Sequence, residues 1–266
     1  MQFEADDELL LYAKKLEGLK LLELGKSIGR LDLVHRKHTK GLIGQLIEKE
    51  YFRIPTNSSE NPDFENLGIE LKVTPLKVLK SGLLNVKERV PIKMIDYFDV
   101  YENENWEDSK IFKKLNKILF IFYIHDNSLS AIDWQIVRAF IWSPSSIQKK
   151  YIQNDYEILR KKILLGERNS EGDHSFLGNC PKHGKGFNKG NPSKSTPSTL
   201  RKHPKIKYAE ARGYCLRERA LDSILSDDLG KPLVKRGAGT GLLKSYFSLE
   251  SEGISYESPQ KIIDDF

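Results

Sequence analysis

Apolar residues follow a helical period in two segments near the start of the chain. The first runs from Glu8 to Leu24 and ends before Gly25; its apolar positions are Leu9, Leu10, Tyr12, Ala13, Leu16, Leu19 and Leu22. The second runs from about Gly41 to Phe52, with Leu42, Ile43, Leu46 and Ile47 on one stripe. Both patterns predict amphipathic helices. The second helix would place Gln45 and Glu48 beside its apolar stripe.

Further along, the pattern changes to that of strands. Residues 69–74 alternate between apolar and polar, and Ile118–Ile124 (ILFIFYI) is apolar throughout, which is typical of a strand buried on both faces. Residues 131–142 predict a strand that can pair with it, and helices are expected over 145–165 and 217–225. This order predicts an α/β domain with a central mixed β-sheet flanked by helices.

The sequence divides into a domain over residues 1–230 and a tail over residues 231–266. The tail contains GAGTG at 237–241, but the Lys-Ser/Thr partner of a phosphate-binding loop is absent. We therefore expect a flexible loop there.

Composition fits a soluble globular protein. The 266 residues are 39% apolar and 10% aromatic, enough to bury a core. No apolar run reaches the roughly 18 residues of a membrane span, and the acidic start MQFEADDELL is unlike a secretory leader. The two cysteines, Cys180 and Cys215, fit a reducing compartment. These features predict a cytoplasmic protein.

Positive charge is concentrated in one segment. Residues 174–209 contain eight Lys or Arg and no Asp or Glu, so this segment carries +8 while the whole chain carries +6. The segment is rich in Gly, Pro and Ser, and such a concentration favours a polyanionic partner, although a solvated basic loop would have the same composition.

The stretch NPDFENLGIELKVTP (61–75) carries the candidate chemistry. Glu70 and Lys72 lie on one face of the predicted strand, and a short turn can bring Asp63 beside Glu70. Two adjacent carboxylates repel each other unless a divalent cation lies between them, and Asp and Glu oxygens with water suit Mg²⁺. The lysine can then orient an attacking water at a phosphodiester. The simpler alternative is a surface ion pair on an edge strand.

The spacing Asp-x(6)-Glu-x-Lys resembles the motif of the PD-(D/E)xK nucleases, whose restriction-endonuclease-like fold it implies. Four blocks, in order between about residues 35 and 226, narrow the likeness to the MutH family. They are KGLIGQLIE (40–48), PDF with GIELKVTP (62–75), WEDS with KLNKILFI (106–121), and RGYCLR with ALDSIL (212–225). The family includes a mismatch-repair nicking enzyme and GATC-cutting type II restriction enzymes of the Staphylococcus kind.

The resemblance implies a role for each matching residue. Asp63 and Glu70 become the ligands of Mg²⁺, Lys72 the catalytic lysine, and Glu48 the helix-borne acid that completes the site. Lys114 becomes a phosphate or active-site contact. DNA contacts are implied for a further set: Lys40, Lys182, His183, Lys185, Arg212, Tyr214 and Arg217. For Lys40 and Glu48 the alternative is an ordinary solvated side chain.

The family reads its DNA sequence with a loop after a late strand, and HSFLGNCPKHGKGFNKG (174–190) takes that place here. Lys182, His183 and Lys185 are the candidates, because lysine can donate to guanine acceptors in the major groove. This loop is longer than in the mismatch-repair enzyme and differs in composition. A zinc site at Cys180-x-x-His183 is an alternative that only Cys215 and scattered histidines could complete.

The resemblance leads to three functional hypotheses. The first is a Mg²⁺-dependent type II restriction endonuclease that cuts double-stranded DNA at GATC; the second is a mismatch-repair nickase, and the third is a non-catalytic DNA-binding module. The divergent loop, the tail and the basic segment favour the first. The end of the chain, SPQKIIDDF (258–266), looks like a linker to a second MutH-like domain. Such a domain, or a transient dimer on DNA, is therefore an expected partner.

Overall fold

A mixed four-stranded sheet forms the centre of the protein in a computed structural model that describes residues 2–34, 41–55, 60–103, 105–167, 174–182, 186–188 and 190–247. The strand order is β2-β1-β4-β5, and the bounds are β1 (Glu70–Val78), β2 (Leu84–Val86), β4 (Ile118–His125) and β5 (Ile136–Trp142). β1 and β4 run parallel, with Glu70 opposite Ile118, whereas β2 and β5 run antiparallel to their neighbours. The predicted pairing of residues 118–124 with the following strand is confirmed.

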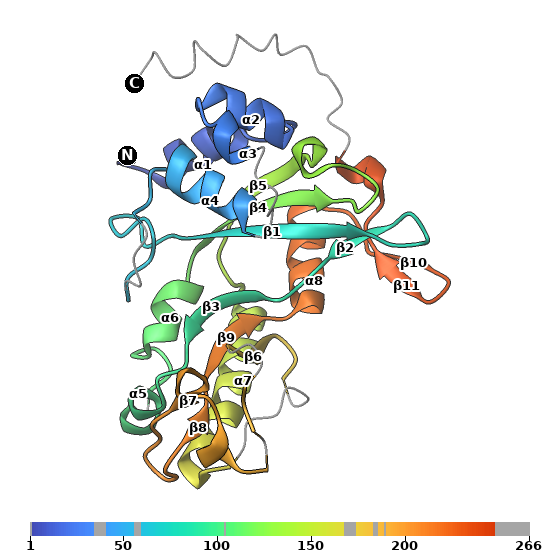
Figure 1. Cartoon of the computed structure of the whole chain (residues 1–266). Coiled ribbons are helices and arrows are strands. Elements are labelled where there is room, and N and C mark those ends of the chain that lie inside the picture. Colours follow the sequence, from blue (N-terminus) through green and yellow to red (C-terminus); the bar gives the residue numbers. More distant parts are fainter. Residues whose placement is uncertain are drawn as a thin grey trace.

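Each face of this sheet is covered by a separate apolar core. Along β4, Leu119 and Ile121 point into one core, and Phe120 and Phe122 into the other. This alternation explains why the strand is apolar throughout, as the sequence predicts. Short N-terminal helices cover the first face (Figure 1): α1 (Asp6–Lys14), α2 (Leu21–Ser27), α3 (Leu31–Val34) and α4 (Leu42–Gln45).

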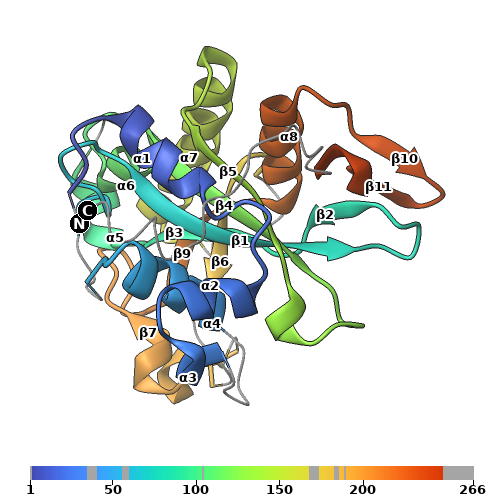
Figure 2. The same cartoon turned by 90° about the horizontal axis from the view of Figure 1, so that it is seen from above.

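The second face packs against helices and a second sheet that the sequence did not predict. The three-stranded antiparallel sheet has the order β3-β9-β6, with bounds β3 (Val90–Met94), β6 (Leu177–Pro181) and β9 (Arg212–Leu216). The helices on this side are α5 (Tyr97–Glu102), α6 (Lys110–Leu115), α7 (Ser146–Leu165) and α8 (Glu218–Leu229). Figure 2 shows α7 and α8 beyond the central sheet, seen from above.

Helix α7 confirms the helix expected over 145–165. Ser145 caps it by accepting a hydrogen bond from the Gln148 amide, and Gly166 ends it in the left-handed conformation (φ 70°). Its buried Asp155 accepts hydrogen bonds from three consecutive amides, those of Ser175, Phe176 and Leu177. The carboxylate therefore fixes the start of β6.

The helix predicted over Glu8–Leu24 is wrong as one element. Gly18 has a positive φ of 86°, and its amide donates to the Ile136 carbonyl. The Leu21 amide donates to the Trp134 carbonyl. The chain between α1 and α2 therefore bonds to the residues leading into β5, and this tertiary pairing outweighs the continuous helical period.

The second predicted helix is present but changes its hydrogen bonding midway. It begins at Gly41 (φ 76°) and passes from α4 into a π-helical turn, η1 (Leu46–Tyr51). The Phe52 amide donates to the Ile47 carbonyl, five residues back. π-Helical turns inside helices are frequent at functional sites.

Two boundaries and one predicted loop also differ from the sequence prediction. The strand expected from residue 131 begins only at Ile136, after a 3-10 turn, η2 (Ala131–Asp133). The late helix extends to Leu229, where Gly230 ends it. The GAGTG segment, expected to be a flexible loop, forms a hairpin of β10 (Val234–Arg236) and β11 (Gly239–Gly241).

The remaining elements are short. They are β7 (Leu200–Arg201), β8 (Ala209–Glu210), and the 3-10 turns η3 (Pro192–Lys194), η4 (Pro197–Thr199) and η5 (Lys244–Phe247). Leu84 and Leu242 exchange two backbone hydrogen bonds, and Leu242 is fully buried. Residues 234–242 thus pack on the main body beyond the predicted boundary at residue 230. In the described ranges, no helix is both long and apolar enough to cross a membrane.

Candidate active site

A tight turn leads from Asp63 into β1. The Phe64 amide donates to the Ile69 carbonyl at 2.9 Å, and Gly68 closes the turn with a φ of 66°. Asp63 Oδ2 accepts a hydrogen bond from the Leu71 amide at 2.9 Å. The turn thus brings Asp63 beside the start of β1, as the sequence predicts.

Glu70 is the centre of an ion-pair group. Its Oε1 lies 2.6 Å from Lys72 Nζ, and its Oε2 lies 2.9 Å from Lys114 Nζ. Glu70 is only 2% exposed, whereas Ile69 and Leu71 pack into the core on the opposite face. A surface ion pair on an edge strand does not describe this arrangement, because the carboxylate is buried and both of its oxygens have a lysine partner.

Lys114 reaches this group from α6, 44 positions along the chain. Ser109 caps α6 by accepting a hydrogen bond from the Phe112 amide. Glu70 also pairs with Ile118 at the start of β4, directly after α6. The parallel pairing of β1 with β4 therefore fixes α6 beside the carboxylate.

Glu48 approaches from the π-helical turn η1. Burial raises its pKa, as do the nearby carboxylates of Asp63 and Glu70, while Lys72 lowers it. The pKa of Asp63 is also raised, first by burial and then by Glu70. Three carboxylates from two separate segments are thus close enough to repel one another.

These side chains face a common pocket of about 790 Å³. Charged residues that line it are Glu48, Glu60, Asp63, Glu70, Lys72, Lys93, Asp96, Lys114, Arg201 and Lys202. Apolar and aromatic residues, among them Ile92, Ile95, Tyr97 and Phe98, form the rest of the wall. The pocket therefore combines acids and bases within an apolar frame.

The donor set fits a hard divalent cation. Asp63 and Glu70 offer oxygen ligands, and a cation would relieve the repulsion from Glu70 that adds to the effect of burial on the pKa of Asp63. Within the described residues, no three His, Cys, Asp or Glu side chains gather in a metal-binding group. The available metal ligands are thus the two carboxylates of Asp63 and Glu70, with water. Glu70 can bind a cation only if Lys72 or Lys114 moves away from one of the Glu70 carboxylate oxygens.

The residues predicted to contact DNA have different positions. Lys40, His183 and Lys185 lie outside the described residues. Lys182 follows β6, is partly exposed, and its side chain lies against Gly213. Arg217 is partly buried and donates to the His174 carbonyl.

Arg212 and Tyr214 lie inside the protein. Arg212 is 6% exposed; its guanidinium pairs with Glu210 at 2.7 Å and donates to Asn179. Tyr214 is 3% exposed, and its hydroxyl has no hydrogen-bond partner in the described part of the chain. This burial argues against the direct DNA contacts expected of both residues.

Other pocket residues were not singled out from the sequence. Arg201 and Lys202 belong to the basic segment but were counted there only as charge. Lys93 lies on β3, a strand too short and mixed in polarity to be predicted, and Glu60 precedes the acidic motif. The charge of Glu60 and its position just before Asn61-Pro62 were the only available signals.

Comparison with known proteins assigns this part of the chain to a family. The family model "DNA mismatch repair enzyme MutH" matches residues 52–155, a range that includes Asp63, Glu70, Lys72 and Lys114. The type II restriction enzyme Sau3AI of Staphylococcus aureus is 33% identical over 221 residues, which are 80% of this chain and 41% of that enzyme. The chain thus covers less than half of that relative's length.

Several mismatch-repair proteins named MutH are also similar. That of Haemophilus ducreyi is 31% identical over 176 residues, 65% of this chain and 74% of the relative. That of Shewanella woodyi is 29% identical over 227 residues, 84% of this chain and 92% of the relative. Such a relative is covered almost from end to end.

Proposed function

Because the chain belongs to the MutH family of DNA endonucleases and has the restriction-endonuclease-like fold, we propose that it is a Mg²⁺-dependent type II restriction endonuclease. Its substrate is double-stranded DNA at GATC. The observation that carries the proposal is the group in which Asp63, Glu70 and Lys72 face one pocket together with Lys114.

Asp63 and Glu70 would hold the cation. When bound, Mg²⁺ supplies a Lewis acid that stabilises the negative charge developing on the phosphate and activates a water. Lys72 can donate a hydrogen bond to the attacking water or to a phosphate oxygen once Glu70 no longer binds its ammonium group. Lys114 is placed to bind another phosphate oxygen, and the open pocket leaves room for the attacking water.

Glu48 holds a proton more readily than an ordinary glutamate, because burial and the neighbouring carboxylates raise its pKa. A protonated Glu48 would reduce the repulsion around Asp63 and Glu70 without a cation. An ionised Glu48 would instead accept a hydrogen bond from a bound water and so orient it. The group is thus suited to adjust its charge when the cation binds.

The basic segment is the candidate reading region. Lys182 is a candidate for a base or phosphate contact because it is partly exposed, and we keep His183, Lys185 and Lys40 as proposed contacts on the resemblance alone. Arg217 remains a candidate because it is partly exposed. We assign Arg212 and Tyr214 to support of the β6–β9 pair.

The runner-up function is a mismatch-repair nickase. This hypothesis is supported by the similarity to MutH of Shewanella woodyi, of which this chain covers 92%. The restriction hypothesis rests on the 33% identity to Sau3AI over 80% of the chain and on the divergent loop after β6. A non-catalytic DNA-binding module is disfavoured, because such a module has no need for two carboxylates beside a lysine.

Partners and location follow from this activity. A single active site cuts one strand at a time, so a double-strand break requires a transient dimer on DNA, a second MutH-like domain, or rebinding. We propose that the enzyme acts in the cytoplasm, where its DNA substrate would be found.

The test is cleavage of two matched duplexes, one with a single GATC site and one with that site scrambled, each with Mg²⁺ and with EDTA. The proposal predicts cuts in both strands at GATC with Mg²⁺ alone. Cleavage of one strand only would favour the nickase. Binding without cleavage would favour the non-catalytic module.

A further inference from the structure

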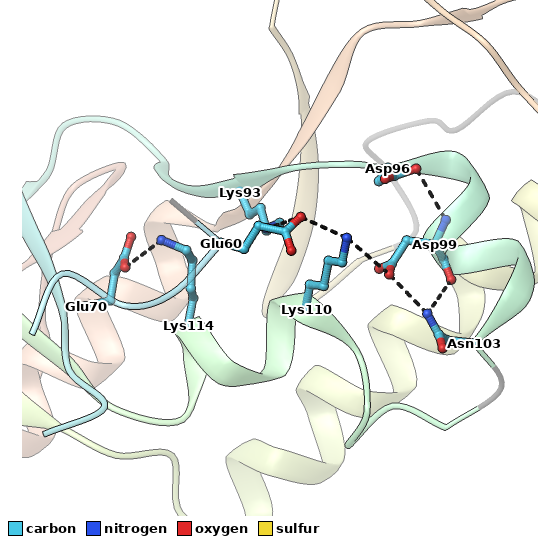
Figure 3. A network of polar contacts seen from close by, with 8 residues as sticks. All are labelled: Glu60, Glu70, Lys93, Asp96, Asp99, Asn103, Lys110 and Lys114. Carbon is cyan, nitrogen blue, oxygen red and sulfur yellow. Dashed lines mark hydrogen bonds and ion pairs between the residues drawn. The ribbon is translucent and has the colours of Figure 1, made fainter. Parts of the chain in front are cut away.

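A second charged group lies beside the active site, and the chemistry described above does not use it. Glu60 Oε1 lies 2.8 Å from Lys110 Nζ and 3.8 Å from Lys93 Nζ. Figure 3 shows the two lysines reaching this carboxylate from different elements, Lys93 from β3 and Lys110 from α6. One carboxylate oxygen thus occupies a position between two ammonium groups.

The two lysines are better anchored than the glutamate. The Lys93 side chain is 16% exposed, whereas that of Glu60 is 62% exposed. Burial lowers the pKa of Lys93, as do the ammonium groups of Lys110 and Lys114, while Glu60 raises it. Since an ion pair with so exposed a partner contributes little to stability, an incoming anion can replace Glu60 at low cost.

Asp99 and Asp96 are further acids near this group, and the Asp99 carboxylate lies 3.8 Å from Lys110 Nζ. Asp99 is fixed in place, because Asn103 donates a hydrogen bond to its carboxylate at 3.0 Å. Asp99 would therefore remain beside Lys110 after Glu60 moved away. The lysine pair would then keep a defined position, with Asp99 offsetting part of its positive charge.

The position of the pair relative to the active site suggests the identity of the anion. Lys110 and Lys114 are four residues apart on α6, so their side chains lie on one face about 5–6 Å apart at Cβ. Lys114 points to Glu70 and Lys110 to Glu60 (Figure 3). This spacing is comparable with that of successive phosphates along a DNA strand. Lys93 and Glu60 also line the pocket that holds Asp63 and Glu70.

We propose that Lys93 and Lys110 bind the DNA backbone phosphate next to the scissile one, and that the Glu60 carboxylate occupies this phosphate site until DNA displaces it. The inference rests on the proposed function, because it assumes that duplex DNA enters this pocket. It adds a phosphate-binding site and an internal competitor for it. Lys93 and Lys110 are positioning residues, since they hold the strand in register and do not touch the reacting phosphorus.

The experiment measures DNA affinity of the full chain in EDTA, so that no cleavage occurs, on a GATC duplex at several salt concentrations. Lys93→Met should weaken binding about tenfold. It should also reduce the slope of log affinity against log salt by about one. Glu60→Gln should tighten binding several-fold, because the site no longer holds a competing carboxylate.

Combining Glu60→Gln with loss of both lysines separates displacement of Glu60 from general repulsion of DNA by Glu60. If Glu60 competes for the lysine pair, Glu60→Gln should have almost no effect in a Lys93→Met, Lys110→Met background. If Glu60 merely repels DNA, the gain in affinity will be equal in both backgrounds, and the proposal is then wrong. Glu65→Gln is the matched control; it removes an exposed acid from the same loop and should change affinity less than twofold in either background.

A modified substrate locates the phosphate. A methylphosphonate at the position beside the scissile phosphate should weaken wild-type binding but have almost no further effect on the Lys93→Met, Lys110→Met variant. Lys93→Arg should restore affinity because it keeps the positive charge, and the unfolding midpoint of Lys93→Met should stay close to that of wild type. If the wild type cleaves GATC while these variants bind DNA as it does, only this inference fails. If the wild type binds no DNA, the proposed function itself fails.

Discussion

The active-site pocket and the sheet β3-β9-β6 both contain buried charges, but the two regions use them differently. In the pocket, Glu70 has two lysine partners, and it lies beside Glu48 and Asp63, whose pKa values are raised by burial and then by neighbouring carboxylates. In the sheet, Arg212 pairs with Glu210 and donates to Asn179, beside a much smaller pocket of about 140 Å³. Buried charge that faces the large pocket can exchange partners, whereas buried charge in the closed network of Arg212, Glu210 and Asn179 stabilises one arrangement.

This comparison assigns different consequences to removing a charge. Loss of a pocket lysine should reduce chemistry while the fold survives. Loss of a network residue should unfold the protein before it affects chemistry. The predictions below test this difference.

The largest effect is expected in the closed network. Arg212→Ala removes the guanidinium that pairs with the buried carboxylate of Glu210, which is 7% exposed, and that donates to Asn179. The free energy of unfolding should fall by about 3–5 kcal/mol. Chemical denaturation measures this change. Arg201→Ala, at an exposed arginine that donates to the backbone carbonyls of Ser198 and Leu200, should stay within about 0.5 kcal/mol of wild type. Equal losses in the two variants would contradict the closed-network account.

The next effect is on catalysis. Lys72→Ala should slow single-turnover cleavage at least about 10²-fold, because it removes a donor placed for the attacking water or the phosphate. Its unfolding midpoint should stay close to that of wild type, since Lys114 still pairs with Glu70. Lys80→Ala, an exposed lysine just after β1, is the matched control and should cleave normally. A large loss of stability with proportional loss of rate would make Lys72 a structural residue instead.

A third effect concerns pH. Asp222 on α8 is buried, and its Oδ1 accepts a hydrogen bond from the Val86 amide at 2.8 Å. Burial raises the pKa of Asp222 from 3.8 to about 6. The folded state therefore binds its proton more tightly than the unfolded state, and this stabilisation is present at low pH and lost as pH rises from about 4 to 6.

At 1.36 kcal/mol per pKa unit, the change in unfolding free energy is at most about 3 kcal/mol. Asp222→Asn can still accept the bond from Val86 and stays neutral. Denaturation at a series of pH values should show that this variant is more stable than wild type at pH 7, with the difference vanishing near pH 4. A difference that is independent of pH would refute the buried-carboxylate explanation.

The smallest effect is expected at Tyr214. Its buried hydroxyl has no hydrogen-bond partner in the described part of the chain, so Tyr214→Phe should change the unfolding free energy by less than about 1 kcal/mol. DNA affinity should remain within twofold of wild type. A pronounced loss of affinity at unchanged stability would restore the DNA contact expected from the resemblance.

The same contrast explains which parts of the molecule could be predicted from sequence. Asp63, Glu70 and Lys72 belong to one turn and one strand, so local spacing and strand alternation suffice to bring them together. Lys114 required the family resemblance, because only the pairing of β1 with β4 brings α6 to Glu70.

The sheet β3-β9-β6 escaped prediction for a physical reason. Its strands have only five residues each, and β6 includes a glycine and a proline, so neither length nor alternation marks them. Arg212 and Tyr214 therefore looked like surface residues of a DNA-binding segment. In the same way, the break between α1 and α2 comes from backbone pairing with the residues before β5, which no helical period reveals.

The central claim is that the acids and the lysine of one turn and strand form the catalytic centre for GATC cleavage. The most direct test is digestion of a plasmid with several GATC sites by wild type, Asp63→Asn and the loop control Glu65→Gln, each with Mg²⁺. Our account predicts GATC-bounded fragments for wild type and Glu65→Gln, and intact plasmid for Asp63→Asn. The same fragments from Asp63→Asn, with the variant folded as wild type, would contradict it.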